Sequence, residues 1–441
     1  MAQLTVRQKL GFGIFDLGGN MLFTVTGFWC LNYLTDTVGL AAALAGIAVM
    51  VGKVWDAVTD PVMGYISDRT KTRFGRRRPY LLIGAPLMVL TMWFFFTKPA
   101  IDSVSLLTVW ATVALMFLNT ASTIINIPYS SLTPELSDDY HERTSLNGYR
   151  FGCAVFGTII GAAAVQPIVG LFPNQTVGFS MVGLILGLII AGTTLLTFFG
   201  TKEKTNHTIP TEPFFATYKV VFTNRPYVVL LMTYALHLTG ITLLQGILVY
   251  YTKYIYHNEA LTTPAMLLLL LTAMVFIPVS VLISKKIGKK RTYQICFVII
   301  ATACAAIFTV GHILGPLFFL VMMVYAGIGV GFSYVAPFAM VPDAIDYEAS
   351  RTGDHKEGAY YGIWTFVAKV GQSLAVFLSG MILDIGGYSA DAVQSTSALF
   401  AIRIIIGPVP VVIFIGALLL IERYALDEKT VNMLARQRDS A

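Results

Sequence analysis

The sequence predicts an all-α membrane protein, and three observations support this class. The 441 residues are 56% hydrophobic and only 12% charged, whereas a soluble domain carries roughly 25% charged residues. Apolar runs such as Val177–Phe199 and Ala265–Ile283 are long enough to cross about 30 Å of hydrocarbon as helices. Segments of about ten residues with alternating polarity, which would indicate a membrane β-barrel, are not found. Helices are therefore the elements that satisfy the backbone inside the bilayer.

Charged clusters and Pro/Gly breaks divide the chain into about twelve apolar segments, each expected to be a transmembrane helix. They run near 11–34, 40–67, 79–97, 104–131, 146–170, 177–199, 227–252, 261–284, 293–312, 316–340, 358–383 and 397–421. The longest polar interruption, 201–225, lies at the middle of the chain and is predicted to be a cytoplasmic linker. It would join two six-helix halves, residues 1–200 and 226–424, with 425–441 as a cytoplasmic tail.

The distribution of lysine and arginine predicts the orientation in the membrane, because short cytoplasmic loops are enriched in both. The loop after the second segment contains Arg69, Lys71, Arg73, Arg76, Arg77 and Arg78. The loop after the eighth contains Lys285, Lys286, Lys289, Lys290 and Arg291. Short loops on the other side carry only Lys98 and Lys253. We therefore expect a multi-pass protein of the inner (plasma) membrane with both termini cytoplasmic, and its +6 net charge gives no reason to expect nucleic acid as a partner.

Two pairs of motifs indicate that the halves are repeats. Gly75-Arg-Arg-Arg-Pro-Tyr80 in the first basic loop resembles Gly288-Lys-Lys-Arg-Thr-Tyr293 in the second. Pro134-Glu135 with Arg143-Thr144 matches Pro342-Asp343 with Arg351-Thr352 at one offset of 208 residues. Two parallel six-helix repeats are the arrangement of the major facilitator fold, in which solute binds near the bilayer midplane between the halves.

Ionisable residues within the second segment are the strongest functional signal. Lys53, Asp56 and Asp60 follow one another at spacings of three and four, so they share one helix face. Each charge near the bilayer centre costs about 2.5–3.5 kcal/mol, which disfavours a lipid-facing stripe. Two carboxylates one turn apart provide hard oxygen ligands for Na⁺ or a pair that shares a proton. The alternative is a structural salt bridge in which Lys53 neutralises one acid.

Further polar residues lie within predicted helices. Asp16 and Asn20 share a face of the first helix, and Asn119, Thr123 and Asn126 share a face of the fourth. These faces either line a cavity or bond helices to each other. Other candidates are Arg150, His237, Lys369 and the aromatic residues Tyr360, Tyr361 and Trp364. For these, the simpler interpretations are an interfacial arginine, an interhelical bond, a snorkelling lysine and ordinary packing.

Several blocks resemble the glycoside–pentoside–hexuronide:cation symporters, the melibiose permease family. Trp55-Asp-Ala-Val-Thr-Asp60-Pro-Val-Met-Gly64 is similar to that family's second-helix signature. Gly64-x3-Asp68-Arg69 through Gly75-Arg76-Arg77 resembles the general loop motif of the major facilitator superfamily. Later blocks also fit: Asn126-Ile-Pro-Tyr129, Leu132-x-Pro134, Val341-Pro-Asp343-x2-Asp346-Tyr347 and Glu357-Gly358 leading to Lys369.

The resemblance implies roles for particular residues. The coupling cation would bind to Asp56, Asp60, Thr59 and Thr123, and if it is Na⁺ the two aspartates are its metal ligands. Sugar would contact Asp16, Asn20, Asn126, Arg150, Trp364 and Lys369. Gating would involve Asp68, Arg69, Arg77, Asp346 and Glu357.

The chain also departs from the family pattern at sugar positions. Asn126 occupies the place of a sugar-binding aspartate, and Ser130 that of a tryptophan. Asn20 aligns with another acid, for which Asp16 is a substitute. These departures leave a second interpretation open, a cation-coupled carrier of lysolipid or another amphiphile within the same wider family.

The mechanism implied is inward symport by alternating access. A cation neutralises Asp56 and Asp60, which releases or repels Lys369 and organises the cavity for solute. The expected partners are a sugar or glycoside, a monovalent cation (Na⁺ or H⁺) and membrane lipid, with no cofactor. Both halves of the cavity belong to one chain, so a monomer suffices. Beyond the carboxylates the sequence contains no catalytic motif, and we expect no enzyme activity.

Overall fold

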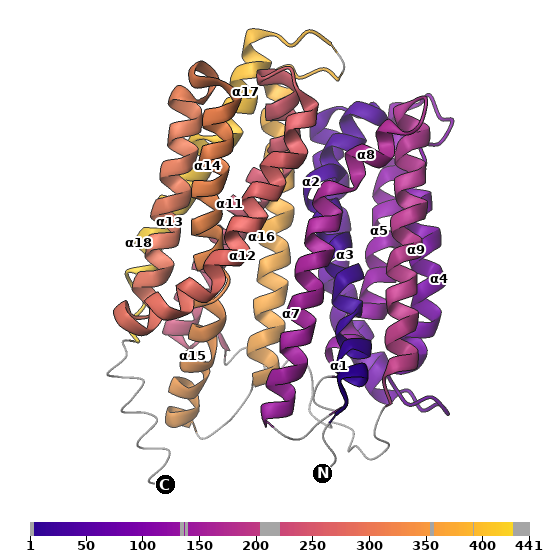
Figure 1. Ribbon diagram of the computed structural model, residues 1–441, viewed down its shortest axis with the longest axis vertical. Helices are drawn as coiled ribbons and strands as arrows, with labels where there is room; N and C mark the ends of the chain where they lie inside the picture. Colours follow the sequence, from indigo (N-terminus) through magenta and orange to yellow (C-terminus); the bar gives the residue numbers. More distant parts are fainter. Residues whose placement is uncertain are drawn as a thin grey trace. The chain divides into compact units, whose positions relative to one another are not determined.

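The computed structural model describes residues 4–132, 136, 140–202, 221–352, 357–390 and 392–426. Every regular element within these residues is a helix (Figure 1). Eleven helical stretches among them are long and apolar enough to cross a membrane. This confirms the predicted all-α membrane class. One stretch, Lys289–Glu348, has 60 residues, about three times the length of a single span, and includes both segments predicted at 293–312 and 316–340.

The chain divides into two compact units, which are described separately. Unit 1 comprises Met1–Pro210 together with Val376–Val393, and unit 2 comprises Thr211–Ala375 together with Gln394–Ala441. The segment Val376–Val393, which we expected within the second half, thus groups with unit 1.

Unit 1 begins with a helix whose start is fixed by local capping. Thr5 Oγ1 accepts a hydrogen bond from the Gln8 backbone N–H at 3.3 Å, and the Thr5 N–H donates to Gln8 Oε1 at 2.9 Å. This capping box begins the helix before the predicted residue 11. The helices of the unit are α1 (Val6–Gly13), α2 (Phe15–Asn32) with the π-turn η1 (Tyr33–Thr37), α3 (Ala42–Arg69), α4 (Arg78–Phe95), α5 (Val104–Ser130), α7 (Tyr140–Ala163), α8 (Val165–Gly170) and α9 (Gln175–Gly200).

Glycines bring α7 directly against α2. A Cβ at Gly157 would lie 2.0 Å from the Leu17 carbonyl oxygen, and one at Gly161 would lie 2.7 Å from that of Met21. Two glycines four residues apart on one helix face allow such close backbone approach in membranes. In the middle of α7, the backbone also lies close to α1, since a Cβ at Gly13 would lie 3.0 Å from the backbone nitrogen of Arg150. This packing holds α2 and the middle of α7 within side-chain reach of each other.

In unit 2, two segments that the sequence predicts as continuous helices are each divided. The predicted segment 316–340 is divided, because α14 ends at Ser333 and α15 continues to Thr352. The segment 397–421 is divided at Gly407, whose backbone is not helical and which precedes a proline. The elements are α11 (Arg225–Tyr250), η2 (Tyr251–Ile255), η3 (Glu259–Leu261), α12 (Thr262–Ile287), α13 (Lys289–Ala306), η4 (Ile307–Gly311), α14 (His312–Ser333), α15 (Ala336–Thr352), α16 (Glu357–Ile385, its end in unit 1), α17 (Thr396–Ile406) and α18 (Pro408–Ile421).

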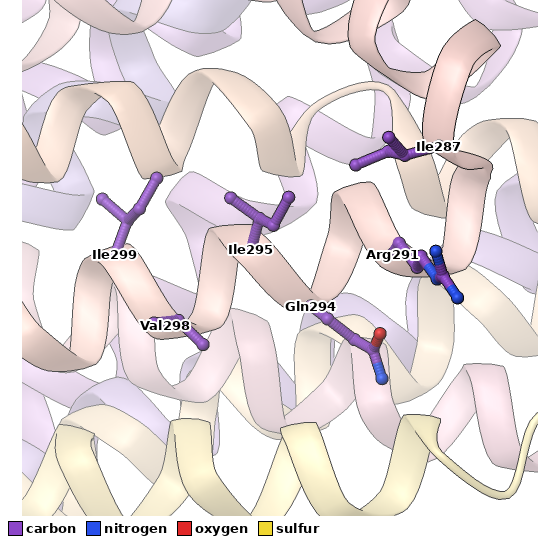
Figure 2. A pocket seen from close by; sticks show the side chains of 6 residues that line it. All are labelled: Ile287, Arg291, Gln294, Ile295, Val298 and Ile299. Carbon is purple, nitrogen blue, oxygen red and sulfur yellow. The ribbon is translucent and has the colours of Figure 1, made fainter.

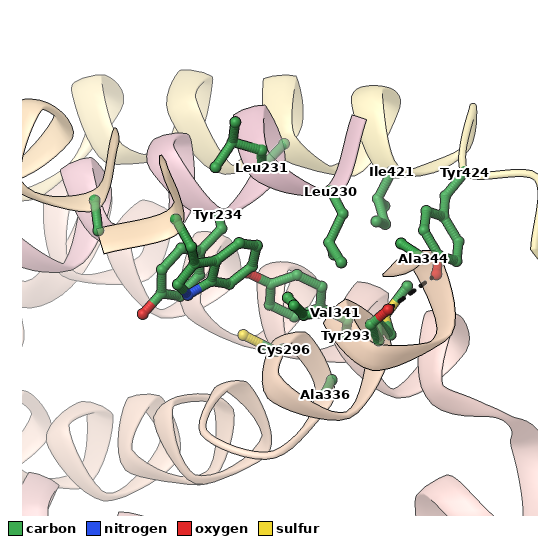
Figure 3. Close-up of a cluster of buried hydrophobic side chains, with 14 of the residues drawn as sticks. Leu230, Leu231, Tyr234, Tyr293, Cys296, Ala336, Val341, Ala344, Ile421 and Tyr424 are labelled. Atoms are coloured by element: carbon green, nitrogen blue, oxygen red, sulfur yellow. Dashed lines mark hydrogen bonds between the residues drawn. The ribbon is translucent and has the colours of Figure 1, made fainter. Parts of the chain in front are cut away.

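The interior of unit 2 is aromatic and aliphatic. Figure 3 shows part of this cluster, in which Tyr234, Tyr293 and Ile421 are buried. Beside it, α14 lies close to α12, because a Cβ at Gly327 would come within 2.6 Å of the Leu269 carbonyl oxygen. Both units thus use glycine contacts to bring helices together.

The two repeated sequence motifs meet within unit 2. Lys289 Nζ, from the second basic loop motif, lies 2.6 Å from Asp343 Oδ2 of the Pro-Asp motif. The same ammonium group donates to the Ala339 carbonyl oxygen at 2.9 Å. An ion pair therefore joins the start of α13 to the middle of α15. In the first repeat the corresponding Glu135 lies outside the described residues.

Candidate functional site

The two membrane acids of α3 converge on one hydroxyl group of α5. Thr123 Oγ1 lies 2.9 Å from Asp56 Oδ1 and 2.9 Å from Asp60 Oδ1. Asp56 is only 8% exposed and Thr123 only 3%. Thr59 Oγ1 lies 3.4 Å from Thr123 Oγ1 and also bonds the Asp56 carbonyl oxygen at 3.1 Å. The structure therefore brings together all four residues that the sequence analysis assigned to the cation.

A single threonine hydroxyl has one proton, so Thr123 donates to one of the two carboxylates at a time. The other carboxylate then faces both a neighbouring negative charge and the hydroxyl oxygen. Two ionised carboxylates at such short range repel each other. A small cation or a shared proton relieves this repulsion.

The donor set fits a small hard cation. Carboxylate and hydroxyl oxygens are the ligand types that such ions prefer. Within the described residues there is no cluster of three or more His, Cys, Asp or Glu side chains suited to a metal ion. Bound Na⁺ would therefore rely on Asp56 and Asp60 together with uncharged oxygens such as the hydroxyl groups of Thr59 and Thr123.

Neighbouring polar residues tie α3 to the helices around it. Asn119 Nδ2 donates to the Gly52 carbonyl oxygen at 2.8 Å, which joins α5 to α3 one turn from the acids. Lys53 Nζ lies 5.9 Å from the centre of the Phe23 ring on α2. Asn119 thus makes the interhelical bond that was the simpler of its two interpretations.

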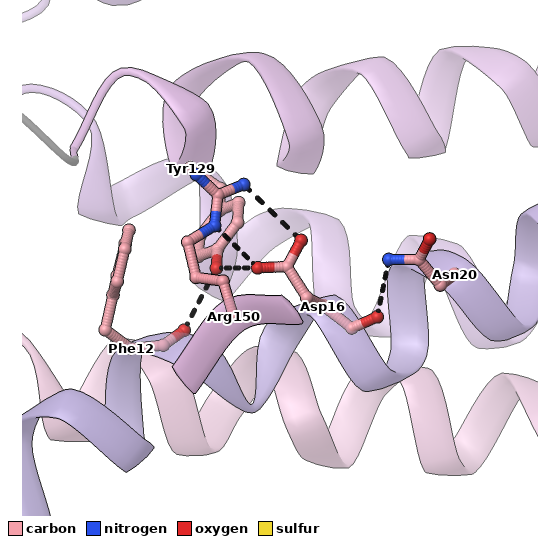
Figure 4. A network of polar contacts seen from close by, with 5 residues as sticks. All are labelled: Phe12, Asp16, Asn20, Tyr129 and Arg150. Carbon is pink, nitrogen blue, oxygen red and sulfur yellow. Dashed lines mark hydrogen bonds and ion pairs between the residues drawn. The ribbon is translucent and has the colours of Figure 1, made fainter. Parts of the chain in front are cut away.

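A second charged cluster lies at the junction of α2, α5 and α7 (Figure 4). Arg150 Nε is 2.7 Å from Asp16 Oδ2, and Tyr129 donates its hydroxyl proton to the same oxygen at 2.5 Å. The guanidinium carbon lies 4.8 Å from the Tyr129 ring centre. The structure thus pairs Asp16 with Arg150, two residues that the sequence analysis had proposed separately as sugar contacts.

Tyr129 is the member of this cluster that the sequence analysis did not assign. The sequence contains a pattern that could have identified it. Asn119, Thr123, Asn126 and Tyr129 follow one another at intervals of four, three and three residues, which places them on one face of α5. Tyrosines are frequent in membrane helices, so the spacing alone does not identify a functional residue. Its hydroxyl group completes the polar face.

The two asparagines proposed as sugar contacts bond locally. Asn20 Nδ2 donates to the Asp16 carbonyl oxygen at 2.9 Å, and Asn126 Nδ2 donates to Ser122 Oγ at 2.8 Å. The oxygen of Asn126 lies 3.7 Å from the point where a Cβ of Gly19 would be. Both amides therefore belong to the region where α2 faces α5.

Candidates in unit 2 lie in different surroundings. The Trp364 side chain is buried, and its ring stacks on Tyr234 with centres 4.1 Å apart and an interplanar angle of 14°. One face of the indole is therefore occupied by protein. Lys369 is half-buried, further along the same helix. His237 Nδ1 lies 3.1 Å from the Tyr293 hydroxyl, an interhelical contact of the kind expected for a structural histidine.

Only some of the residues predicted to gate transport have side chains in the described part of the structure. The side chains of Asp68 and Glu357 lie outside the described part of the chain. Arg69 is exposed, with its guanidinium carbon 3.6 Å from the Tyr65 ring centre, whereas Arg77 is buried. Asp346 is exposed on α15. Their gating roles stay predictions.

A groove of about 450 Å³ runs along α13 and the end of α12 (Figure 2). Its lining is aliphatic apart from two polar side chains and consists of Ile287, Arg291, Gln294, Ile295, Val298 and Ile299. None of these residues was predicted for the cation or sugar sites. The groove is therefore separate from both charged clusters.

A family model described as MFS/sugar transport protein matches residues 11–428. The putative glycoside/cation symporter YagG of Escherichia coli (strain K12) is 29% identical, over 99% of this chain and 95% of that protein. The sodium-dependent lysophosphatidylcholine symporter 1-A of Danio rerio is 25% identical, over 97% of this chain and 87% of that protein.

Among solved structures, a mutant form of the nucleoside transporter NupG superimposes with a TM-score of 0.69. The superposition covers 94% of this chain and 99% of that one, at 13% sequence identity. At this identity the likeness concerns the fold, and it agrees with the major facilitator architecture expected from the repeated motifs.

Proposed function

The chain belongs to the MFS/sugar transport protein family, and we propose that it carries a sugar or glycoside into the cell together with a small cation, Na⁺ or H⁺. It is a transporter and not an enzyme. We assign it to the inner membrane with both termini in the cytoplasm, because short loops rich in lysine and arginine are typical of the cytoplasmic side. Both units belong to one chain, so a monomer is sufficient for transport.

One observation carries the proposal of cation coupling. Two carboxylates within a membrane-spanning helix, Asp56 and Asp60, share the hydroxyl group of Thr123 at 2.9 Å each. A structural role would be satisfied by one acid and one partner, since each further charge in the bilayer is costly. A convergent pair of acids is instead suited to exchange a cation.

The proposed cycle follows from this charge arrangement. Without a cation, repulsion between Asp56 and Asp60 makes the site unstable in its compact form. Binding of Na⁺ or H⁺ removes part of this negative charge and lets α3 and α5 approach. The solute then binds at polar residues of unit 1, namely Asp16, Asn20, Asn126 and Arg150. Only the protein that is loaded with both cation and solute, or with neither, changes between the states of the alternating-access cycle.

The driving force is adequate for accumulation. One elementary charge crossing about 100 mV releases roughly 2.3 kcal/mol. This free energy corresponds to about fiftyfold accumulation of a neutral solute.

The test is uptake into proteoliposomes of a radiolabelled panel of glycosides and pentosides, under imposed Na⁺ or H⁺ gradients. We expect one gradient to drive accumulation, which identifies the ion. Asp56→Asn and Asp60→Asn should lose accumulation by at least about tenfold, because each removes a cation ligand. Asp102→Asn, at an exposed position outside the helices, is the matched control and should behave as wild type.

Two results would contradict the proposal. Normal gradient-driven accumulation by both variants would show that the acids of α3 do not bind the coupling ion. Failure of every sugar to move under either gradient would remove the sugar as the solute.

The second candidate is cation-coupled carriage of a lysolipid or another amphiphile. It is favoured by the similarity to the lysophosphatidylcholine symporter and by the replacement of sugar-binding positions with Asn126 and Ser130. Uptake of labelled lysophosphatidylcholine under the same gradients, without uptake of any sugar, would select this candidate.

A further inference from the structure

Arg150, the proposed sugar-binding arginine, lies beside a carboxylate of opposite charge. Asp16 Oδ2 lies 2.7 Å from Arg150 Nε, and Asp16 Oδ1 lies 3.4 Å from a terminal nitrogen of the same guanidinium (Figure 4). Both oxygens of the carboxylate therefore face the guanidinium group. The side chains are 23% and 15% exposed for Arg150 and Asp16 respectively, so water does not fully screen the pair.

Tyr129 fixes the position of this carboxylate. Its hydroxyl oxygen lies 2.5 Å from Asp16 Oδ2 and 3.2 Å from the Phe12 carbonyl oxygen, and its single proton is best used on the charged acceptor. The Tyr129 ring is fully buried against Phe12 and Phe15, with ring centres 4.8 Å and 4.2 Å away. The phenol is thus held rigidly, and it holds the acid toward Arg150.

Backbone packing supports the same arrangement. Gly157 of α7 contacts the Leu17 carbonyl group, next to Asp16, and Gly13 contacts the backbone at Arg150. These close approaches hold the backbone of α7 near the backbones of α1 and α2 on either side of the pair. The pair is therefore part of the packed structure of unit 1.

The combined charge of this pair is zero, and this restricts the solute. A guanidinium group has five N–H donors and a carboxylate has about four lone-pair sites, which exceeds what the pair uses internally. A neutral sugar hydroxyl is able to accept from Arg150 and donate to Asp16 together. An anionic sugar would bring its carboxylate beside that of Asp16, where like charges repel.

We propose that Asp16 is the internal counter-ion of Arg150 and thereby selects neutral over anionic sugars. The inference rests on the proposed function, because it requires the sugar to approach Arg150. Tyr129 acts as a positioning residue in this arrangement. Removal of the Asp16 charge leaves the arginine able to pair with an acid on the solute.

The test compares two sugars that differ in one group, a neutral hexoside and the corresponding uronide with a carboxylate at C6. The hexoside is the one transported in the uptake panel. Each is used as a competitor of hexoside uptake by the full-length protein in proteoliposomes. The readout is the ratio of the half-inhibitory concentrations, uronide over hexoside.

Wild type should give a ratio of at least about ten, as expected for one unfavourable charge contact. Asp16→Asn should lower this ratio by at least about tenfold, whereas Asp16→Glu, which keeps the charge, should retain it. Tyr129→Phe loses a hydrogen bond but no charge, so hexoside affinity should fall while the ratio stays within about twofold.

If Asp16→Asn does not fold, Asp16→Asn combined with Arg150→Gln replaces it, since this pair has no unbalanced charge. The double variant should bind hexoside weakly with a ratio near one. An unchanged ratio in Asp16→Asn or in the double variant, or a wild type that prefers the uronide, overturns the counter-ion role while leaving symport intact. A wild type that transports no sugar overturns the proposed function instead, and this inference with it.

Discussion

Corresponding helices of the two units carry different chemistry. The helix before the basic loop in unit 1, α3, contains Asp56 and Asp60, whereas its counterpart in unit 2, α12, contains no acidic residue. Unit 1 has two charged clusters, while the described interior of unit 2 around Tyr293 is an aromatic and aliphatic core. The packing device is nevertheless shared, since both units use glycines for close helix contacts.

This difference teaches that a duplicated fold need not duplicate its site. Membrane charges are costly wherever they lie, so they persist where a function requires them. The described core of unit 2 packs its helices mainly through aromatic and aliphatic side chains. We therefore expect unit 1 to determine ion dependence and solute charge, and unit 2 to respond to mutation mainly through stability.

The largest effect is expected at the α2–α7 contact of unit 1. Gly157→Ala would place a Cβ 2.0 Å from the Leu17 carbonyl oxygen, and the helices must separate. We expect a loss of about 3 kcal/mol or more in stability, seen as a lower Tm in detergent, together with loss of uptake. Gly152→Ala, on the same helix with no atom within 4 Å of its Cβ, is the control. A wild-type Tm for Gly157→Ala would disprove the contact.

The corresponding change in unit 2 should affect stability without affecting the ion. Gly327→Ala would bring a Cβ within 2.6 Å of the Leu269 carbonyl oxygen, which should lower stability by about 1–3 kcal/mol. The apparent cation affinity of the folded protein should stay within about twofold of wild type. Gly246→Ala, whose Cβ has no neighbour within 4 Å, is the matched control. A shift in apparent cation affinity in Gly327→Ala, but not in Gly246→Ala, would contradict the expectation that unit 1 determines ion dependence.

A smaller and more specific effect is expected at the hydroxyl group shared by the acids. Thr123→Val keeps the side-chain shape but removes the donor to Asp56 and Asp60, so apparent cation affinity should fall about tenfold. Thr123→Ser should recover most of it. The control is Thr112→Val, since the Thr112 hydroxyl bonds only its own helix at the Thr108 carbonyl oxygen among the contacts described. Cation titrations of uptake measure all three, and equal affinities would exclude a role for the hydroxyl.

The smallest effect is expected in the core of unit 2. Tyr293→Phe removes the hydroxyl 3.1 Å from His237 Nδ1 and should cost about 1 kcal/mol in stability. Gradient-driven accumulation should be unchanged, because this pair lies outside the proposed ion site. Tyr251→Phe, which loses a longer contact to a backbone carbonyl group, provides the comparison. Altered gradient-driven accumulation in Tyr293→Phe, but not in Tyr251→Phe, would show that unit 2 takes part in cation coupling.

The helical class and the acids of α3 were predictable because both follow from local patterns. Apolar length determines whether a segment crosses the bilayer, and a spacing of four places Asp56 and Asp60 on one face. Helix ends were less predictable. The division at Gly407 depends on backbone conformation, which composition does not specify.

The partners of each polar side chain were decided by the tertiary structure. Asp16 and Arg150 are separated by 134 residues, and their pairing depends on how closely Gly157 lets α7 approach α2. Trp364 has a ring suited to stack on a sugar, yet Tyr234 occupies one of its faces. A sequence pattern cannot state which neighbour a side chain meets.

The sequence by itself therefore determined that this chain is a helical membrane protein with two pairs of similar motifs and a pair of intramembrane acids, because periodicity and hydropathy act within single helices. Only the tertiary structure decided that Thr123 lies between those acids and that Tyr129 turns Asp16 toward Arg150. Such contacts arise from packing between distant helices, where the volume of a few glycines sets which polar atoms meet.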